Sequence, residues 1–236
     1  MCRKTNIAVL ISGSGTNLQA IIDACESGKI DGKVVVVGAD NNNAKGLDRA
    51  KNRGIPTFVI DYSQIIKSFK DNQLPIDFNL KDVLSKQSIF DTESDPEKVK
   101  LFMMTRSVAE EKLFNTLSSF DFDLLALAGF MRILTPYFID KVNKDRMRII
   151  NIHPALLPSF PGTDGYGDTF RYGCKVGGCT VHFVDYGEDS GPIIGQKAFE
   201  INDCDTLETV KEKGLKLEWE LYPHCIQLFE KLYHHR

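Results

Sequence analysis

Three polar side chains in the second half of the chain have the chemistry of an oxyanion and proton-transfer site. Asn151 and His153 end an apolar run and stand two positions apart, so on a strand they project from the same side. An amide donates to an oxygen that gains negative charge, and an imidazole gives or takes a proton near neutral pH. Asp189, in a Gly-flanked acidic turn, can orient the imidazole, raise its pKa, or take a proton through water. Taken singly, each is more often a structural polar group.

No covalent nucleophile accompanies these residues. The sequence contains no Gly-x-Ser-x-Gly, and neither Cys174 nor Cys179 has a motif-level pairing with His153. Direct transfer of an acyl-like group to an amine or water, through a tetrahedral intermediate, therefore fits better than a covalent enzyme intermediate. A structural role is favoured for His182, which lies inside an alternating strand pattern.

A second polar cluster follows the first apolar run, residues 6–11. Leu18, Ile21 and Ile22 then recur at helical spacing. A strand, a glycine-rich turn and a helix in this order direct backbone N–H groups at an anion. The candidate residues are Gly13, Ser14, Gly15, Thr16 and Asn17. The third glycine of a dinucleotide fingerprint and the Gly-Lys-Ser/Thr of a Walker loop are absent, so a phosphomonoester is favoured. The alternative is a tight turn that binds no ligand.

The elements that must position these residues alternate between strand and helix. The first 60 residues read β-α-β-α-β, which predicts an α/β fold: a doubly wound, mostly parallel open sheet with helices on both faces. The later pattern predicts a helix at 106–117, a strand at 124–129, a helix from Pro136, strands at 148–152, 179–184 (half-exposed) and within 192–201, and a helix at 206–232 that Pro223 kinks or restarts.

We expect a single domain, 1–236, in three parts. Residues 1–60 form the phosphate-binding part, 62–105 an insertion, and 106–236 the catalytic part on the same sheet. The insertion is rich in Lys, Asp, Ser and Asn with isolated apolar residues. We expect it to hold at least one helix, because a structureless loop of this length is unusual, and to be poorly ordered around 92–98.

Composition and charge are those of an ordinary globular protein. The chain has 236 residues, 42% hydrophobic and 26% charged, with a net charge of −3 that gives no support for nucleic-acid or membrane partners. Its six cysteines are scattered, which predicts free thiols, and no Cys/His pair at zinc spacing accompanies Cys174 and Cys179, so no metal is predicted. With no signal peptide and no long apolar run, a cytoplasmic location is expected.

Several motifs in order resemble the formyltransferase family that uses 10-formyltetrahydrofolate. They are residues 151–158 (Asn-Ile-His-Pro-Ala-Leu-Leu-Pro), 181–184 (Val-His-Phe-Val), 189–194 (Asp-Ser-Gly-Pro-Ile-Ile), 11–21 and 128–134 (Ala-Gly-Phe-Met-Arg-Ile-Leu). The resemblance covers roughly residues 5–60 and 106–233, and implies a Rossmann-like formyltransferase fold. It is strongest to the branch of the family that formylates glycinamide ribonucleotide in purine biosynthesis.

The resemblance also implies roles for individual residues. Asn151, His153 and Asp189 match the catalytic trio, and Gly13, Ser14 and Gly15, with Thr16 and Asn17, match the loop on the ribonucleotide phosphate. Glu218 matches a helix carboxylate that contacts the glycinamide substrate. The implied folate contacts are Arg106, Met131, Arg132, Ile133, Leu134, Asp185, Tyr186, Gly187 and Glu188.

The implied reaction is attack of the substrate's glycine amine on the formyl carbon of 10-formyltetrahydrofolate, with no metal. The resemblance implies small-molecule partners and leaves monomer and homodimer open. A deformylase that releases formate is the alternative, although such enzymes usually carry a further N-terminal domain. A methionyl-tRNA formyltransferase is disfavoured because no basic surface or RNA-binding domain is evident. Two features depart from the family pattern: the long 62–105 insertion, and residues 163–168, where a histidine-containing segment is common.

Overall fold

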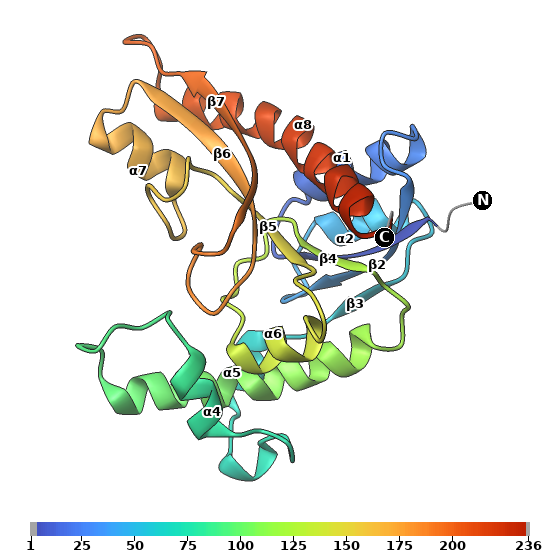
Figure 1. Ribbon diagram of the computed structural model, residues 1–236, viewed down its shortest axis with the longest axis vertical. Helices are drawn as coiled ribbons and strands as arrows, with labels where there is room; N and C mark the ends of the chain where they lie inside the picture. Colours follow the sequence, from blue (N-terminus) through green and yellow to red (C-terminus); the bar gives the residue numbers. More distant parts are fainter. Residues whose placement is uncertain (1–3, 235–236) are drawn as a thin grey trace.

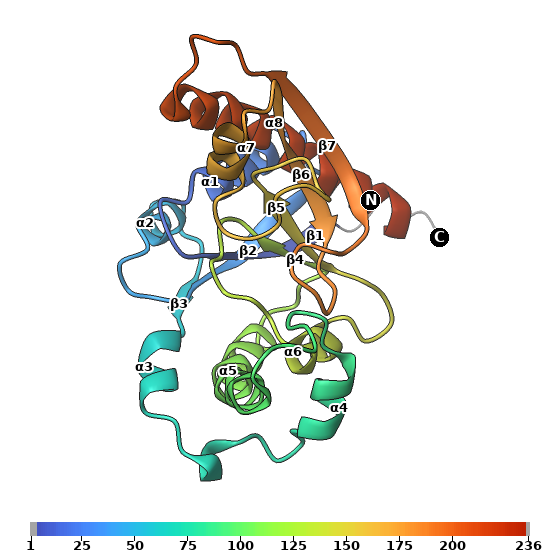
Figure 2. The ribbon, with the colours of Figure 1, turned by 90° about the vertical axis from the view of Figure 1, so that its left-hand side faces the viewer.

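The computed structural model describes residues 4–234 as one seven-stranded sheet covered by helices on both faces (Figures 1 and 2). The strands are β1 (Thr5–Ile11), β2 (Gly32–Ala39), β3 (Thr57–Val59), β4 (Leu124–Leu127), β5 (Ile149–His153), β6 (Val176–Phe183) and β7 (Ile193–Glu200). The helices are α1 (Thr16–Glu26), α2 (Gly46–Lys51), α3 (Tyr62–Lys67), α4 (Leu80–Lys86), α5 (Pro96–Leu117), α6 (Pro136–Val142), α7 (Gly165–Tyr172) and α8 (Leu207–His234), with a short 3₁₀ turn η1 (Asp71–Gln73).

The strand order is β3-β2-β1-β4-β5-β6-β7, and the first five of these strands are parallel. β6 and β7 pair antiparallel to complete the sheet. The predicted mostly parallel α/β fold is confirmed. The chain winds outward in opposite directions from β1 and β4, so the loops at their carboxyl ends diverge and leave a crevice, the usual ligand site of an open α/β sheet.

Each face of the sheet has its own hydrophobic core, and β1 shows how one strand serves both. Ile7, Val9 and Ile11 point into the core under α1, α2 and α8, while Ala8 and Leu10 point to the side of α5 and α6. A strand covered on both faces is apolar throughout, which is why this run reads as continuous rather than alternating.

The 62–105 insertion is helical, as predicted, and forms the end of the molecule farthest from α8 (Figure 1). The long helix α5 begins at Pro96, ten residues before the predicted start. The Asp95 carboxylate accepts from the Glu97 N–H and caps the helix, and Pro96 occupies the first turn, where its missing N–H costs nothing. Part of the segment predicted to be poorly ordered, 92–98, is regular structure, because Asp95 caps α5 and residues 96–98 form its first turn.

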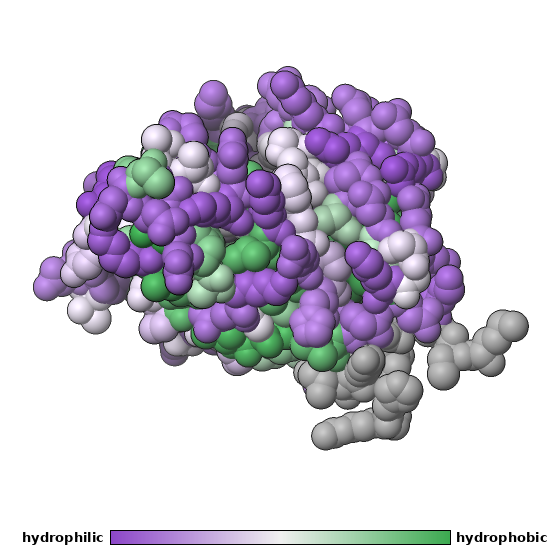
Figure 3. Space-filling view, turned by 90° about the horizontal axis from the view of Figure 1, so that it is seen from above, coloured by the Kyte–Doolittle hydropathy of each residue, from purple (hydrophilic) through white to green (hydrophobic). Residues whose placement is uncertain are grey.

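The C-terminal half differs from expectation at two elements. β6 lies between β5 and β7 and is almost fully buried, not half-exposed, because α8 covers its Cys179 and Val181 face. Helix α7 was not predicted: its Gly-Tyr-Gly-Asp sequence lacks a clear apolar period. Pro223 lies inside an α8 that continues through it. The molecular surface at the α7–α8 end is largely hydrophilic, with apolar residues in patches (Figure 3).

Between residues 4 and 234, none of the helices has the length and apolar character needed to span a membrane. The five described cysteines are unpaired, and Cys2 lies outside the described residues.

Candidate active site

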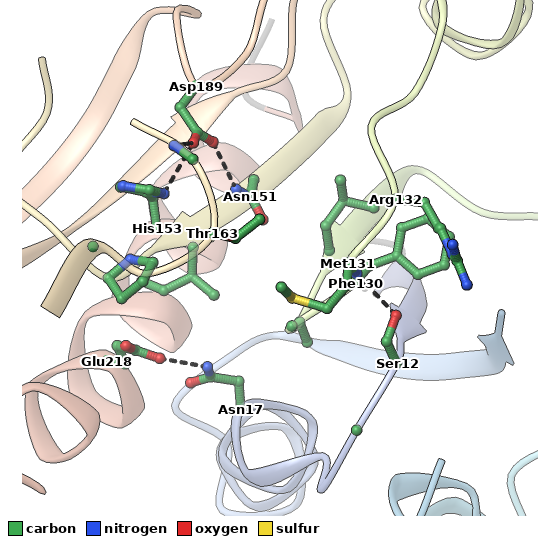
Figure 4. A pocket seen from close by; sticks show the side chains of 18 of the residues that line it. Ser12, Asn17, Phe130, Met131, Arg132, Asn151, His153, Thr163, Asp189 and Glu218 are labelled. Atoms are coloured by element: carbon green, nitrogen blue, oxygen red, sulfur yellow. Dashed lines mark hydrogen bonds and ion pairs between the residues drawn. The ribbon is translucent and has the colours of Figure 1, made fainter. Parts of the chain in front are cut away.

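A cavity of about 520 Å³ opens at the carboxyl ends of β1, β4 and β5 (Figure 4). This size suits a drug-sized ligand. It brings together segments that are far apart in sequence: the loop after β1, the loop after β4, the end of β5, the turn before β7, and α8. Most of the predicted site residues line it: Gly13, Ser14, Gly15, Thr16, Asn17, Met131, Arg132, Ile133, Leu134, Asn151, His153, Asp185, Gly187, Glu188, Asp189 and Glu218.

The predicted trio meets in space at one wall of this cavity. Asn151 and His153 leave β5 on the same side, as their spacing predicts, and the turn between β6 and β7 brings Asp189 against them. Asp189 Oδ2 lies 3.1 Å from His153 Nδ1 and accepts from the Gly162 N–H at 2.9 Å. The Asn151 amide lies 3.4 Å from Asp189 Oδ1, which is long for a hydrogen bond.

The surroundings of His153 favour its imidazolium form. Its side chain is 2% exposed, and its two ring nitrogens face acceptors: the Asp189 carboxylate and, at 2.8 Å from Nε2, the Phe160 carbonyl. Only the doubly protonated ring donates to both. Burial alone lowers the pKa of His153, but the hydrogen bond and charge of Asp189, together with the Phe160 carbonyl, outweigh it and raise the pKa above 6.5. Burial opposes ionisation of Asp189, yet hydrogen bonds from the histidines hold its pKa well below 3.8.

His182 belongs to this cluster, although the strand pattern favoured a structural role. It lies directly opposite Asn151 in the β5–β6 pairing, with Nε2 3.3 Å from the Asn151 amide and 3.4 Å from Asp189 Oδ1. Its Nδ1 lies 2.8 Å from the Phe183 carbonyl. The available signal was its place in the motif at 181–184. The alternation of that strand was misleading because the polar side of β6 faces the cavity, not solvent.

The glycine loop precedes α1 and is braced by α2. Gly15 has φ +71° and lies against α2, so that an added Cβ would approach the Gly46 Cα to 2.6 Å. Arg49 donates to the Ser14 carbonyl at 2.9 Å. Lys211 and Arg132 are the only Lys or Arg side chains lining the cavity among residues 4–234, so an anion here would rely mainly on backbone N–H groups and the helix end.

The loop after β4 is fastened to the glycine loop. Ser12 donates its N–H to the Gly129 carbonyl at 2.9 Å, and its hydroxyl accepts from the Met131 N–H at 2.8 Å. Arg132 is paired with Asp40 at the end of β2 and lies over the Tyr62 ring. Phe130, Leu134 and Val184 also line the cavity, giving it an apolar wall suited to a flat ring system.

Glu218 projects from α8 into the cavity opposite the trio. Its side chain accepts from Asn17 at 2.6 Å and from the Tyr166 hydroxyl at 2.6 Å. Burial raises the pKa of Glu218 above its ordinary value, and these two hydrogen bonds partly offset that effect.

Two predicted folate contacts do not line the cavity. Arg106 lies on α5 with its guanidinium over the Phe102 ring, at 4.4 Å from the centroid, and its Nε is buried without a hydrogen-bond partner. Phe102 lies one helical turn earlier, so the Arg106 side chain runs along the helix to contact it. The Tyr186 hydroxyl donates to Asp140 on α6, so this ring turns away from the cavity that its neighbours in the acidic turn line.

Cavity-lining residues to which the sequence prediction assigned no ligand contact include Phe130, Thr163, Tyr166, His182 and Lys211. Within the described part of the chain, no group of three or more His, Cys, Asp or Glu side chains is placed to hold a metal ion.

Comparison with known proteins decides the family. A sequence profile described as formyl transferase matches residues 5–226. The chain belongs to the formyl transferase family. The resemblance inferred from the motifs is therefore confirmed. The family profile spans the glycine loop, the β4 loop, the trio and Glu218, so the whole cavity described above lies within the matched region.

Individual members of the formyl transferase family are similar over almost the whole chain. Phosphoribosylglycinamide formyltransferase of Bacillus subtilis is 34% identical over 220 residues, which cover 93% of this chain and 92% of that protein. The trifunctional purine biosynthetic protein adenosine-3 of Bos taurus is 35% identical over 226 residues, 96% of this chain but only 18% of that protein. The crystal structure of phosphoribosylglycinamide formyltransferase from Bacillus halodurans superimposes with a TM-score of 0.74 at 31% identity, covering 96% of this chain and 95% of that one.

Proposed function

We propose that this formyl transferase moves the formyl group of 10-formyltetrahydrofolate to the glycine amine of glycinamide ribonucleotide. The observation that carries the proposal is the convergence of Asn151, His153 and Asp189 on the cavity that the glycine loop and the β4 loop also line. A formyl donor and a phosphorylated acceptor need such a shared cavity, because their reacting atoms must meet. The names of the similar proteins point to the same acceptor.

The acceptor phosphate would bind at residues 13–17, where N–H groups at the start of α1 face the cavity. Glu218 would contact the donor groups of the same substrate. The folate would lie along Met131–Leu134 and residues 185–188, with its ring system against the apolar wall. The formyl group would then be placed beside the trio.

The chemistry follows from charge. The acceptor amine attacks the formyl carbon, a C–N bond forms, and the carbonyl oxygen becomes an oxyanion. The Asn151 amide donates to this oxygen, and the positive charge of His153 stabilises it. Collapse of the intermediate breaks the bond between the formyl carbon and the folate N10. The proton lost by the amine is delivered to N10 through a water molecule beside Asp189.

His153 stabilises the oxyanion mainly through its positive charge and not through a direct hydrogen bond. Because its Nε2–H already donates to the Phe160 carbonyl, a direct hydrogen bond to the substrate requires that contact to be exchanged. Phe160 has φ +55°, an uncommon conformation for a phenylalanine. The His153–Asp189 pair stays in place through such an exchange because it uses the other ring nitrogen.

A steady-state assay with 10-formyltetrahydrofolate, with and without glycinamide ribonucleotide, tests the proposal. We expect tetrahydrofolate to form only when the acceptor is present, together with formylated acceptor in equal amount. Equal rates with and without the acceptor would instead identify the hydrolase that the trio alone also permits. A cytoplasmic location and a monomeric or homodimeric state stay predictions.

A further inference from the structure

A buried polar cluster outside the trio faces the cavity and is built around Glu218. The side chains of Tyr166, Asn17 and Glu218 are 5%, 7% and 5% exposed. The Tyr166 hydroxyl donates to Glu218 Oε1 and the Asn17 amide donates to Oε2, both at 2.6 Å. The carboxylate is thus held from both sides by neutral donors, not by a lysine or arginine.

The Asn17 side chain has one polar atom left over. Its amide nitrogen is used by Glu218, while its Oδ1 is buried with no hydrogen-bond partner. A buried acceptor without a donor costs stability unless a ligand or water satisfies it. Asn17 and Glu218 both line the cavity and present acceptor oxygens to it, while the donors of this cluster, the Asn17 amide and the Tyr166 hydroxyl, are already used by Glu218.

The position of Tyr166 is determined by packing between α7 and α8. Its ring occupies the space that a side chain at Gly214 would need, since an added Cβ would lie 2.1 Å from Tyr166 Cζ. Phe199, Ile201 and Val210 enclose the other sides of the ring. This packing fixes the Tyr166 ring, so its hydroxyl is held within hydrogen-bond distance of Glu218.

We propose that Tyr166 is a positioning residue that aligns Glu218 to receive hydrogen-bond donors, hydroxyl or amine, of the phosphorylated acceptor. This inference rests on the proposed function and deepens it. The Glu218 carboxylate disfavours a phosphate beside it, so the acceptor lies with its phosphate on the backbone N–H groups of residues 13–17 and its donor groups at the side-chain oxygens of Glu218 and Asn17. Tyr166 thereby affects recognition of the acceptor and not of the formyl donor.

Tyr166→Phe tests the proposal, because it removes the hydroxyl and keeps the ring. We expect the KM for glycinamide ribonucleotide to rise about tenfold, with kcat and the KM for 10-formyltetrahydrofolate changed less than about twofold. Tyr172→Phe is the matched control: this tyrosine is on the same helix, 80% exposed, and should leave every constant unchanged. An unchanged acceptor KM, or an equal rise of both KM values, would overturn the proposal.

Gly214→Ala provides a second variant that retains the hydroxyl. Its Cβ displaces the Tyr166 ring, so we expect the acceptor KM to rise as in Tyr166→Phe. An unchanged KM would show that the alignment of Tyr166 is irrelevant.

A readout independent of turnover separates this proposal from the proposed function. Carbon-13 NMR of glutamate-labelled protein follows ionisation of Glu218, assigned with Glu218→Gln. Because the Tyr166 hydrogen bond lowers the pKa of Glu218, we expect that pKa to be higher in Tyr166→Phe than in the parent. If the parent fails to formylate glycinamide ribonucleotide, the proposed function is wrong, and the titration still decides whether Tyr166 holds Glu218. An identical pKa in both proteins would refute that role.

Discussion

At the scale of single residues, the site is built on a buried ion pair between His153 and Asp189. His153 and Asp189 are buried together, and each counteracts the cost of burying the other. His182 adds a second contact to the same carboxylate. Removing Asp189 therefore removes both the orientation and the charge of His153, although the imidazole remains.

Asp189→Asn tests this coupling. We expect turnover to fall by about two to four orders of magnitude, as for loss of a general acid–base partner, while folate binding survives. His153→Ala should have a similar effect. In the imidazole NMR titration, the pKa of His153 should lie above 6.5 in the parent and drop in Asp189→Asn, because burial then opposes the charge without Asp189 to offset it. The ring signal of exposed His224 is the internal control.

The same pair predicts the sign of the pH dependence of stability. Because the pKa of His153 is raised in the folded protein, the stabilisation that His153 contributes is complete below pH 6.5. It is lost as pH rises through the pKa of His153 in the folded state. The stabilisation that Asp189 contributes is present above pH 3.8 and is lost as pH falls toward the lowered pKa of Asp189 in the folded state. The difference in unfolding free energy between parent and Asp189→Asn should therefore be largest between about pH 4 and 6.5. A difference that grows above pH 8 would contradict the pairing.

At the scale of elements, the carboxyl ends of β1 and β4 are joined to each other before any ligand binds. Ser12 fastens the glycine loop to the β4 loop, and α2 braces the glycine loop from behind. The proposed acceptor and donor subsites are thus parts of one rigid edge, which favours a fixed approach of the reacting groups.

Gly15→Ala tests the rigidity of the glycine loop. The residue combines a positive φ with close contact to Gly46, so we expect a loss of about 1–3 kcal/mol of unfolding free energy and a rise of the acceptor KM of about tenfold or more. Gly28→Ala, at the other end of α1, has φ +77° but open space around it. In this control we expect a loss of unfolding free energy from backbone strain, measured by denaturant unfolding, and an unchanged acceptor KM, measured by steady-state kinetics.

At the scale of the whole molecule, the insertion is fastened to the turn that carries Asp189. The Ser88 N–H donates to the Tyr186 carbonyl at 2.9 Å, and Lys86 pairs with Asp140 at 2.8 Å. Asp140 also accepts from the Tyr186 hydroxyl. The insertion therefore supports Asp189, a proposed catalytic residue, through the neighbouring residue Tyr186.

Asp140→Asn tests this connection. The ion pair is partly exposed, so we expect a loss of no more than about 1 kcal/mol of stability, but faster amide hydrogen exchange at Ser88 and residues 185–189 and a several-fold lower kcat. Asp82→Asn removes the other partner of Lys86 on α4 and leaves the Tyr186 contact intact, so it is the matched control. Equal exchange at residues 185–189 in the two variants would show that the insertion does not support the turn.

The sequence alone determined the features that depend on local order along the chain. Continuous apolar runs predict buried parallel strands, the glycine loop between a strand and a helix predicts an anion site, and the i, i+2 spacing places Asn151 and His153 on one side of β5. The motif pattern predicted the family and the members of the trio. None of these inferences requires knowledge of contacts between distant segments.

Only the tertiary structure decided which distant side chains meet. His182 joins the trio because β6 pairs antiparallel with β5, and Tyr166 reaches Glu218 because α7 packs at Gly214. Arg106 and Tyr186 leave the cavity because Phe102 and Asp140 are their nearer partners. Side-chain direction and pairing register are set by packing over the whole molecule. The sequence around a polar residue in a strand, or in a helix without apolar periodicity, therefore does not indicate which residues its side chain contacts.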